Sequence, residues 1–257
     1  MIDAFQRTGY MCRPLLSAPQ VQQLREICDT AYHETGDREM LVSRFLANPS
    51  LSALPFSEPV IDTLTLLLGF GCHLFPNFTV RSGLYADWHI DAGFKNADAR
   101  DPQTTFVQCA VYLQDNDLKS GGGLDVVPGS HVLPPVTDGT TLTQRLLEQV
   151  QARHSIGNKA GDLVVWDARL LHRGTPATDA PVRLKFGIHW TVACASAAID
   201  DFMRHLIRRS TVMRDGEVRI VPRYAEMANV QYPANYPASV VREVERWGLA
   251  VESARPA

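Results

Sequence analysis

Apolar and polar residues alternate along three stretches in the middle of the chain. In residues 74–81 the apolar positions are interleaved with a mostly polar set, and residues 105–113 and 183–190 repeat the pattern. Successive side chains of a β-strand point to opposite faces of its sheet, so a period of two residues predicts strands. The three stretches therefore predict strands with one apolar and one polar face.

Short apolar runs predict further strands beside clear turn signals. The glycines at 121–123 precede the run 124–127, and the run 162–167 leads through a turn to residues 170–172. Clusters of glycine mark turns, and apolar runs of this length between turns are typical of buried strands.

Helical periodicity lies toward both ends of the chain. A helix is expected from Ser17, whose hydroxyl suits an N-cap, to about His33, with Gly36 as its stop. A second helix is expected after Ser57, with Gly69 as its stop. Residues 140–154, 196–209 and 239–247 also have helix-like patterns.

This order of elements predicts a mainly β fold with flanking helices, built on an antiparallel double-sheet core of jelly-roll type. We expect a single domain over 1–257, in which 1–70 form a helical cover, 72–193 the β core and 194–257 a C-terminal helical region. The polar strand faces either line a wet pocket or form the solvated side of a sheet, and alternation alone does not choose between these alternatives.

Composition narrows the class of protein. The 257 residues are 45% hydrophobic and 21% charged, with a formal net charge of −3. This composition suits a packed core, and the chain has no basic block that would indicate nucleic acid or an anionic membrane. The longest apolar run, 64–70, is too short to span a bilayer, and the N-terminus has no signal-peptide pattern. The five cysteines have no C-x-x-C spacing, which favours reduced thiols in a cytoplasmic protein.

One tripeptide stands out chemically. His89-Ile90-Asp91 is the only His-x-Asp of the chain. In an extended segment, residues two apart share a face, so the imidazole and the carboxylate would lie side by side. Together with one remote histidine, such a pair makes the facial triad of a non-haem Fe(II) oxygenase. By itself the tripeptide is weak evidence, and a polar strand end that faces water is the more common explanation of such a pair.

Three longer segments carry a family resemblance. His89-x-Asp91 is followed by Gly122-Gly123-Leu124-Asp125-Val126-Val127-Pro128-Gly129-Ser130-His131, by the segment 160–174 that contains His172, and by Arg183. This order resembles the phytanoyl-CoA dioxygenase (PhyH) family of Fe(II)- and 2-oxoglutarate-dependent oxygenases. The resemblance covers about residues 5–195 and is dense from 85 to 190. It implies a double-stranded β-helix (jelly-roll, cupin-like) core.

The resemblance also implies roles for single residues. His89, Asp91 and His172 match the iron ligands, and Arg183, eleven residues after His172, matches the partner of the far carboxylate of 2-oxoglutarate. A guanidinium fits a carboxylate with two parallel hydrogen bonds. Further cosubstrate contacts are expected from Asn77, Gln108 and Thr175, each with an alternative role in the sheet or in a turn. His131 is interpreted either as a structural residue or as one that supports a metal ligand without binding the metal. O2 is the second cosubstrate, and ascorbate is expected to stimulate turnover in vitro.

The resemblance favours hydroxylation among the reactions of this iron chemistry. Halogenating relatives replace the metal-binding aspartate with a small residue, whereas this chain keeps Asp91. We expect hydroxylation of an unactivated C–H bond in a small-molecule substrate, with release of succinate and CO2. Desaturation, cyclisation or epoxidation stays open, as does a non-catalytic β-barrel that binds a metal and a small ligand. No nucleic-acid or membrane partner is expected, and the protein is expected to be a monomer or a small homo-oligomer.

Overall fold

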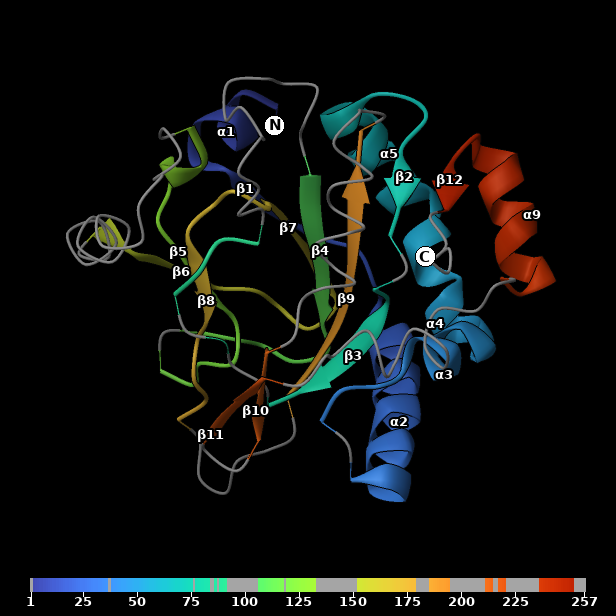
Figure 1. The fold of residues 1–257 in the computed structure, drawn as a ribbon, viewed down its shortest axis with the longest axis horizontal. Coiled ribbons are helices and arrows are strands. Elements are labelled where there is room, and N and C mark those ends of the chain that lie inside the picture. Colours follow the sequence, from blue (N-terminus) through green and yellow to red (C-terminus); the bar gives the residue numbers. More distant parts are fainter. Residues whose placement is uncertain are drawn as a thin grey trace.

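The computed structural model of the chain describes residues 2–36, 38–75, 77–83, 86, 88–91, 106–117, 119–132, 152–178, 185–194, 211–214, 217–220 and 236–251. Within these residues, two sheets form the centre of the molecule, and helices cover one side of the larger sheet (Figure 1).

The larger sheet has seven strands in the order β1-β7-β4-β9-β2-β12, with β3 also paired to β9. Its pairs are antiparallel except for β12 beside β2, which is parallel. The strands are β1 Tyr10–Pro14, β2 His73–Leu74, β3 Thr79–Ser82, β4 Phe106–Tyr112, β7 Asp162–Asp167, β9 Phe186–Ala193 and β12 Ala250–Val251. The predicted strands in 74–81, 105–113, 162–167 and 183–190 are confirmed within the described residues.

The smaller sheet has the order β6-β5-β8, with both pairs antiparallel. Its strands are β5 Leu124–Val126, β6 His154–Ile156 and β8 His172–Gly174. A separate hairpin joins β10 Thr211–Arg214 and β11 Glu217–Ile220. The predicted jelly-roll class, mainly β with flanking helices, is confirmed, and the two sheets are open rather than closed into a barrel.

The two longest helices of the described residues begin and end where the sequence predicts. α2, Ala18–Thr35, starts after Ser17 and ends at Gly36, whose φ of 69° is the left-handed conformation that glycine adopts without strain. α5, Glu58–Leu68, starts after Ser57 and ends at Gly69. The other helices are α1 Ile2–Thr8, α3 Val42–Ala47, α4 Pro49–Ser52, the 3-10 turns η1 Leu54–Phe56 and η3 Ser130–Val132, and α9 Ala238–Trp247.

Three expectations about the elements change in the structure. Residues 1–70 are not helical throughout, because β1 pairs with β7 as an edge strand of the larger sheet. His154 belongs to strand β6 rather than to a helix, while most of the predicted helix 140–154 and all of 196–209 lie outside the described residues. The region 194–257 is not helical throughout either, because it contains strands β10, β11 and β12, although the predicted helix 239–247 is confirmed as α9.

The two faces of the larger sheet pack against different partners. Val107, Cys109 and Val111 of β4 face the helices and join their apolar side chains in the main core. Ala110 and Tyr112, the alternate residues of the same strand, pack toward the smaller sheet in a second cluster that includes Trp166, Leu124 and Val126. The polar positions of the larger sheet therefore open onto the space between the two sheets, which is where a site can form.

One stretch, Pro49–Leu68, is long and apolar enough to cross a membrane by length and composition alone. This differs from the expectation because α4, η1 and α5 follow one another and together reach that length. Half of the stretch is buried inside the molecule, where Leu51, Val60 and Leu64 pack in the main core. A helix that packs in the core of a protein can meet the same criteria of length and composition.

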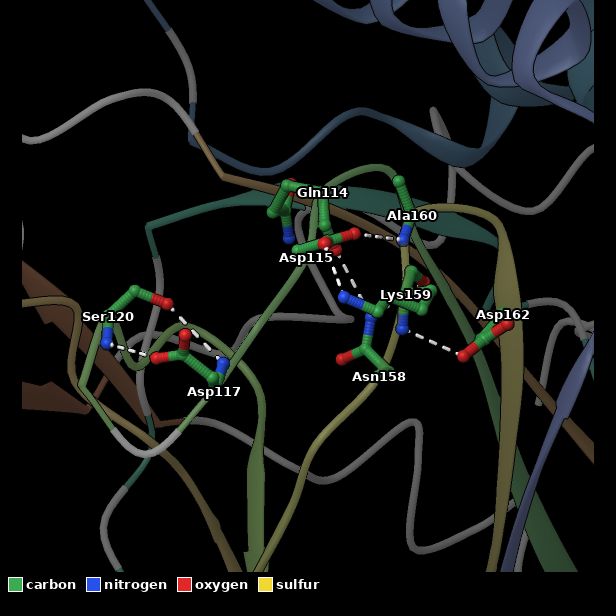
Figure 2. A network of polar contacts seen from close by, with 8 residues as sticks. All are labelled: Gln114, Asp115, Asp117, Ser120, Asn158, Lys159, Ala160 and Asp162. Atoms are coloured by element: carbon green, nitrogen blue, oxygen red, sulfur yellow. Dashed lines mark hydrogen bonds and ion pairs between the residues drawn. The ribbon is translucent and has the colours of Figure 1, made fainter.

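Polar contacts fasten the loop after β4 to the turn before β7 (Figure 2). The Asp115 carboxylate accepts from the backbone N–H of Ala160 and from the Lys159 ammonium, each at 2.9 Å. Asp162 accepts from the Lys159 backbone N–H at 2.7 Å, and Asp117 accepts from that of Ser120, also at 2.7 Å. This network fixes the loop that leads into the glycines at 121–123.

Candidate metal centre

Backbone pairing brings the His-x-Asp segment against β8. The N–H of His89 donates to the carbonyl of His172 at 2.9 Å, and the N–H of His172 donates back at 3.0 Å. The N–H of Asp91 donates to the carbonyl of Ala168 at 2.8 Å. Two segments that are about eighty residues apart in the sequence therefore present their side chains at one place.

The three side chains converge. One potential ligand atom from each of His89, Asp91 and His172 lies within 4.8 Å of the others. Nε2 of His89 lies 3.5 Å from one Asp91 oxygen, and Nε2 of His172 lies 3.3 Å from the other. Asp91 and His172 are buried, whereas His89 is partly exposed. The predicted triad is thus assembled, with one open side.

The electrostatics of the triad suit a divalent cation. Burial would raise the pKa of Asp91, but His172 and His89 outweigh burial and hold that pKa well below its usual range. The carboxyl is therefore ionised at neutral pH. Nδ1 of His172 lies 2.8 Å from the carbonyl oxygen of Leu170. A carbonyl only accepts, so Nδ1 donates to it, and Nε2 is the nitrogen that faces Asp91 and could bind a metal.

Comparisons with known proteins agree with this geometry. Residues 57–183 match the family described as Phytanoyl-CoA dioxygenase (PhyH). The chain carries a PhyH domain. No curated protein matches the chain. The PhyH family and the similar solved structures are iron- and 2-oxoglutarate-dependent oxygenases, which places the domain in that enzyme class.

Three solved structures illustrate the similarity of fold. The epimerase SnoN from nogalamycin biosynthesis has a TM-score of 0.60 and 21% identity, over 76% of this chain and 80% of SnoN. EctD from S. alaskensis, solved with 2-oxoglutarate and 5-hydroxyectoine, has a TM-score of 0.59 and 19% identity, over 75% of this chain and 74% of EctD. EvdMO1 has a TM-score of 0.60 and 18% identity over 76% of this chain, which spans only 49% of EvdMO1.

Asn77 and Gln108 of the PhyH domain meet at one threonine of β9. The Asn77 amide donates to Oγ1 of Thr191 at 2.5 Å, and its oxygen accepts from the Thr191 N–H at 3.2 Å. Oγ1 of Thr191 donates to Oε1 of Gln108 at 2.7 Å. Asn77 lies in the gap between β2 and β3, so its side chain replaces a missing ladder bond. Both side chains therefore make hydrogen bonds within the sheet, which is the alternative role expected for them. Their contact with the cosubstrate stays a prediction.

Thr175 is turned away from the metal ligands. Alternation along β8 places Arg173 and Thr175 on the face opposite to His172. Its hydroxyl donates to Oδ1 of Asp125 at 2.7 Å, on a carboxylate that also accepts from Nε of Arg173 at 2.9 Å. The geometry therefore gives Thr175 a structural partner and counts against a contact with 2-oxoglutarate.

The segment 183–190, where a strand with the cosubstrate arginine is predicted, is only partly described. Arg183 lies outside the described residues, so its role stays a prediction. Lys185 is buried, and its ammonium donates to the carbonyls of Ser120 and Gly121 at 3.0 and 2.8 Å. A Cβ at Gly187 would come within 2.5 Å of Nε2 of His189. The space at this glycine is therefore filled by the His189 ring rather than reserved for a ligand.

Two aromatic residues that the sequence did not single out as site residues line the centre. The ring of Trp166 lies 5.5 Å from that of His172 and 6.3 Å from that of His189. Burial, the Arg81 guanidinium and His172 hold the pKa of His189 well below its usual range, against the opposing pull of Asp91. His189 is thus a neutral residue in the wall of the centre. The sequence could not predict that Trp166 lies beside His172 and His189, because this depends on how β7 pairs with β4 and β4 with β9.

His131, in the Pro-Gly-Ser-His turn, lies apart from the three ligands. It is buried, and its Nε2 lies 3.0 Å from the carbonyl oxygen of Gln6 in α1. Gly9 leaves room for its ring, since a Cβ there would come within 2.6 Å of Nδ1. The interpretation of His131 as a structural residue agrees with these contacts.

Proposed function

We propose that this protein is an Fe(II)- and 2-oxoglutarate-dependent dioxygenase that hydroxylates an unactivated C–H bond of a small metabolite, with release of succinate and CO2. The observation that carries the proposal is the convergence of two imidazoles and an ionised carboxylate inside a PhyH domain. This donor set is typical of non-haem Fe(II) oxygenases. When bound, the iron would couple the oxidative decarboxylation of 2-oxoglutarate by O2 to oxidation of the substrate.

The residues around the triad have distinct tasks in this proposal. His89, Asp91 and His172 hold the metal, and their single negative charge leaves the centre with a net charge of about +1, which favours an anionic cosubstrate. Arg183 binds the far carboxylate of 2-oxoglutarate. Thr191 occupies Oε1 of Gln108 and leaves its amide N–H groups to donate. We assign these donors to an acceptor oxygen of the cosubstrate, and Asn77 helps to hold the threonine in place.

Supporting observations bear on location and product. The five cysteines all lie in the described residues and form no disulfide, which supports a reducing, cytoplasmic environment. Among the similar structures SnoN is an epimerase and SnoK a carbocyclase. Cyclisation and epimerisation are therefore alternatives, and desaturation and epoxidation would use the same iron chemistry. Asp91 keeps the third ligand position filled by protein, which favours hydroxylation over halogenation.

Succinate release tests the proposal. The purified protein is given Fe(II), ascorbate, 2-oxoglutarate and O2, with and without a panel of small metabolites, and succinate is quantified. We expect release that depends on Fe(II) and O2 and is absent in His172→Ala. Products of stimulated reactions are then analysed for an added oxygen atom. Metal binding without release under any condition would favour the non-catalytic binder instead.

A further inference from the structure

Trp88 and Arg173 are the sequence neighbours of two metal ligands, and they contact each other. The guanidinium carbon of Arg173 lies 5.1 Å from the centre of the Trp88 ring, within the range of a cation–π contact. Arg173 and His172 are consecutive in β8 and point to opposite faces of the sheet. The contact therefore lies behind the bridge between His89 and His172.

A buried carboxylate fixes this contact from the other side. Asp125 is only 2% exposed and lies opposite Arg173 and Ser155 in the register of the smaller sheet. It accepts from Nε of Arg173 at 2.9 Å, from Oγ1 of Thr175 at 2.7 Å and from the Ser155 hydroxyl. One carboxylate thus joins β5, β6 and β8 and sets the direction of the guanidinium.

The segment that carries His89 is held to β8 by fewer backbone hydrogen bonds than a strand in a continuous ladder. His172 belongs to strand β8, whereas His89 pairs with it through an isolated bridge rather than a continuous ladder. The flanking backbone bonds run from Asp91 to Ala168 and from Gly174 to Ala86. A side-chain contact directly behind the bridge resists any change in the separation of the two imidazoles.

We propose that the stack of Trp88, Arg173 and Asp125 is a positioning device that sets the separation of His89 and His172 for the metal. The inference rests on the proposed function, because it presumes that the triad binds Fe(II). None of the three residues contributes a ligand atom to the triad. They act through the backbone of the ligand residues, so their loss should weaken metal binding before it affects any other step.

Metal titration tests the stack directly. Fe(II) is titrated anaerobically into the metal-free wild type, Arg173→Ala and Trp88→Leu, and Co(II) is titrated in parallel because its visible spectrum reports coordination geometry. We expect dissociation constants about 10- to 100-fold higher in both variants, the usual effect of losing a contact that orients a ligand. The double variant should lose little more than the worse single one, because both changes remove the same contact.

Three comparisons separate positioning from general stability. Arg246→Ala removes a similar contact, 4.9 Å from the ring of Trp247 in α9, and should leave metal affinity unchanged. Thr175→Val removes one bond to Asp125 but spares the stack, so its effect on metal affinity should be small. If Arg173→Ala or Trp88→Leu does not fold, the milder variants Arg173→Lys and Trp88→Phe take their place. We expect these to lose metal affinity to an intermediate degree.

The outcomes are distinct. Folded stack variants that bind both metals within about twofold of the wild type, an effect far below a tenfold change, would overturn the proposal. A change in affinity with an altered Co(II) spectrum supports it. A wild type that binds Fe(II) tightly but releases no succinate would contradict the proposed function alone, because the positioning effect is read from metal binding.

Discussion

Replacing Thr191 with valine is expected to release Gln108 from its fixed orientation. Thr191 is fully buried, and its hydroxyl both accepts from Asn77 and donates to Gln108. Valine keeps the branched shape but has no hydroxyl. The amide of Gln108 would then be free to rotate, and its oxygen rather than its N–H groups could face the site.

The size of the effect follows from the two lost bonds. Each contributes about 1 kcal/mol net to the free energy of unfolding. Burying a methyl in place of the hydroxyl recovers up to about 0.8 kcal/mol. Gln108 and Asn77 are partly exposed, so water can satisfy their released groups. We expect a loss of about 1–2 kcal/mol in stability, and a rise of about tenfold or more in the apparent KM for 2-oxoglutarate, the effect of losing one hydrogen bond to a charged group.

Thr191→Ser is the matched control. Serine keeps the hydroxyl and removes a buried methyl, which costs about 1 kcal/mol of stability. Urea unfolding should therefore show similar losses of stability in both variants, while succinate release over a titration of 2-oxoglutarate should separate them. Equal KM values for 2-oxoglutarate in the valine and serine variants would refute the assignment of Gln108 as an oriented donor.

Further predictions concern the ligands, the cosubstrate arginine and acid stability. His89→Ala, Asp91→Ala and His172→Ala should each abolish Fe(II)-dependent succinate release with the circular dichroism of the fold retained; full activity with iron bound would remove that residue from the ligand set. Arg183→Ala should raise the apparent KM for 2-oxoglutarate about 100- to several-thousand-fold, since breaking a buried charge pair costs about 3–5 kcal/mol, and Arg183→Lys should recover part of the loss; a rise under about threefold would fit a surface pair instead. Burial would raise the pKa of Asp125, but bonds from Ser155, Thr175 and Arg173 outweigh burial and lower that pKa below 3.8. At low pH the folded state then binds fewer protons than the unfolded state. The stability that the Asp125 carboxylate contributes is therefore full above about pH 3.8, the unfolded value, and is lost as the pH falls through the lower folded pKa. Urea unfolding of the metal-free protein across this window should show a shallower pH dependence in Asp125→Asn, and parallel curves would contradict the reasoning.

The sequence alone determined the elements whose signals are local. Helices α2 and α5 lie where Ser17, Gly36, Ser57 and Gly69 predict their ends, because caps act on the backbone within one turn. Strands β4 and β9 follow the alternation of their side chains. The triad was also predictable, because His-x-Asp fixes two ligands on one segment and the family resemblance supplies the third.

Only the tertiary structure decided which strands pair and what each polar side chain contacts. β1 and β6 are strands because β7 and β5 offer partners far away in the sequence, and their own residues carry no strong pattern. Thr175 follows His172 closely in the sequence yet faces Asp125, because an odd separation along a strand reverses the face. Gly187 and His189 are two residues apart and share a face of β9, so the ring of His189 fills the space beside the glycine. Contacts of this kind depend on register, which is a property of two segments together and cannot be read from either one alone.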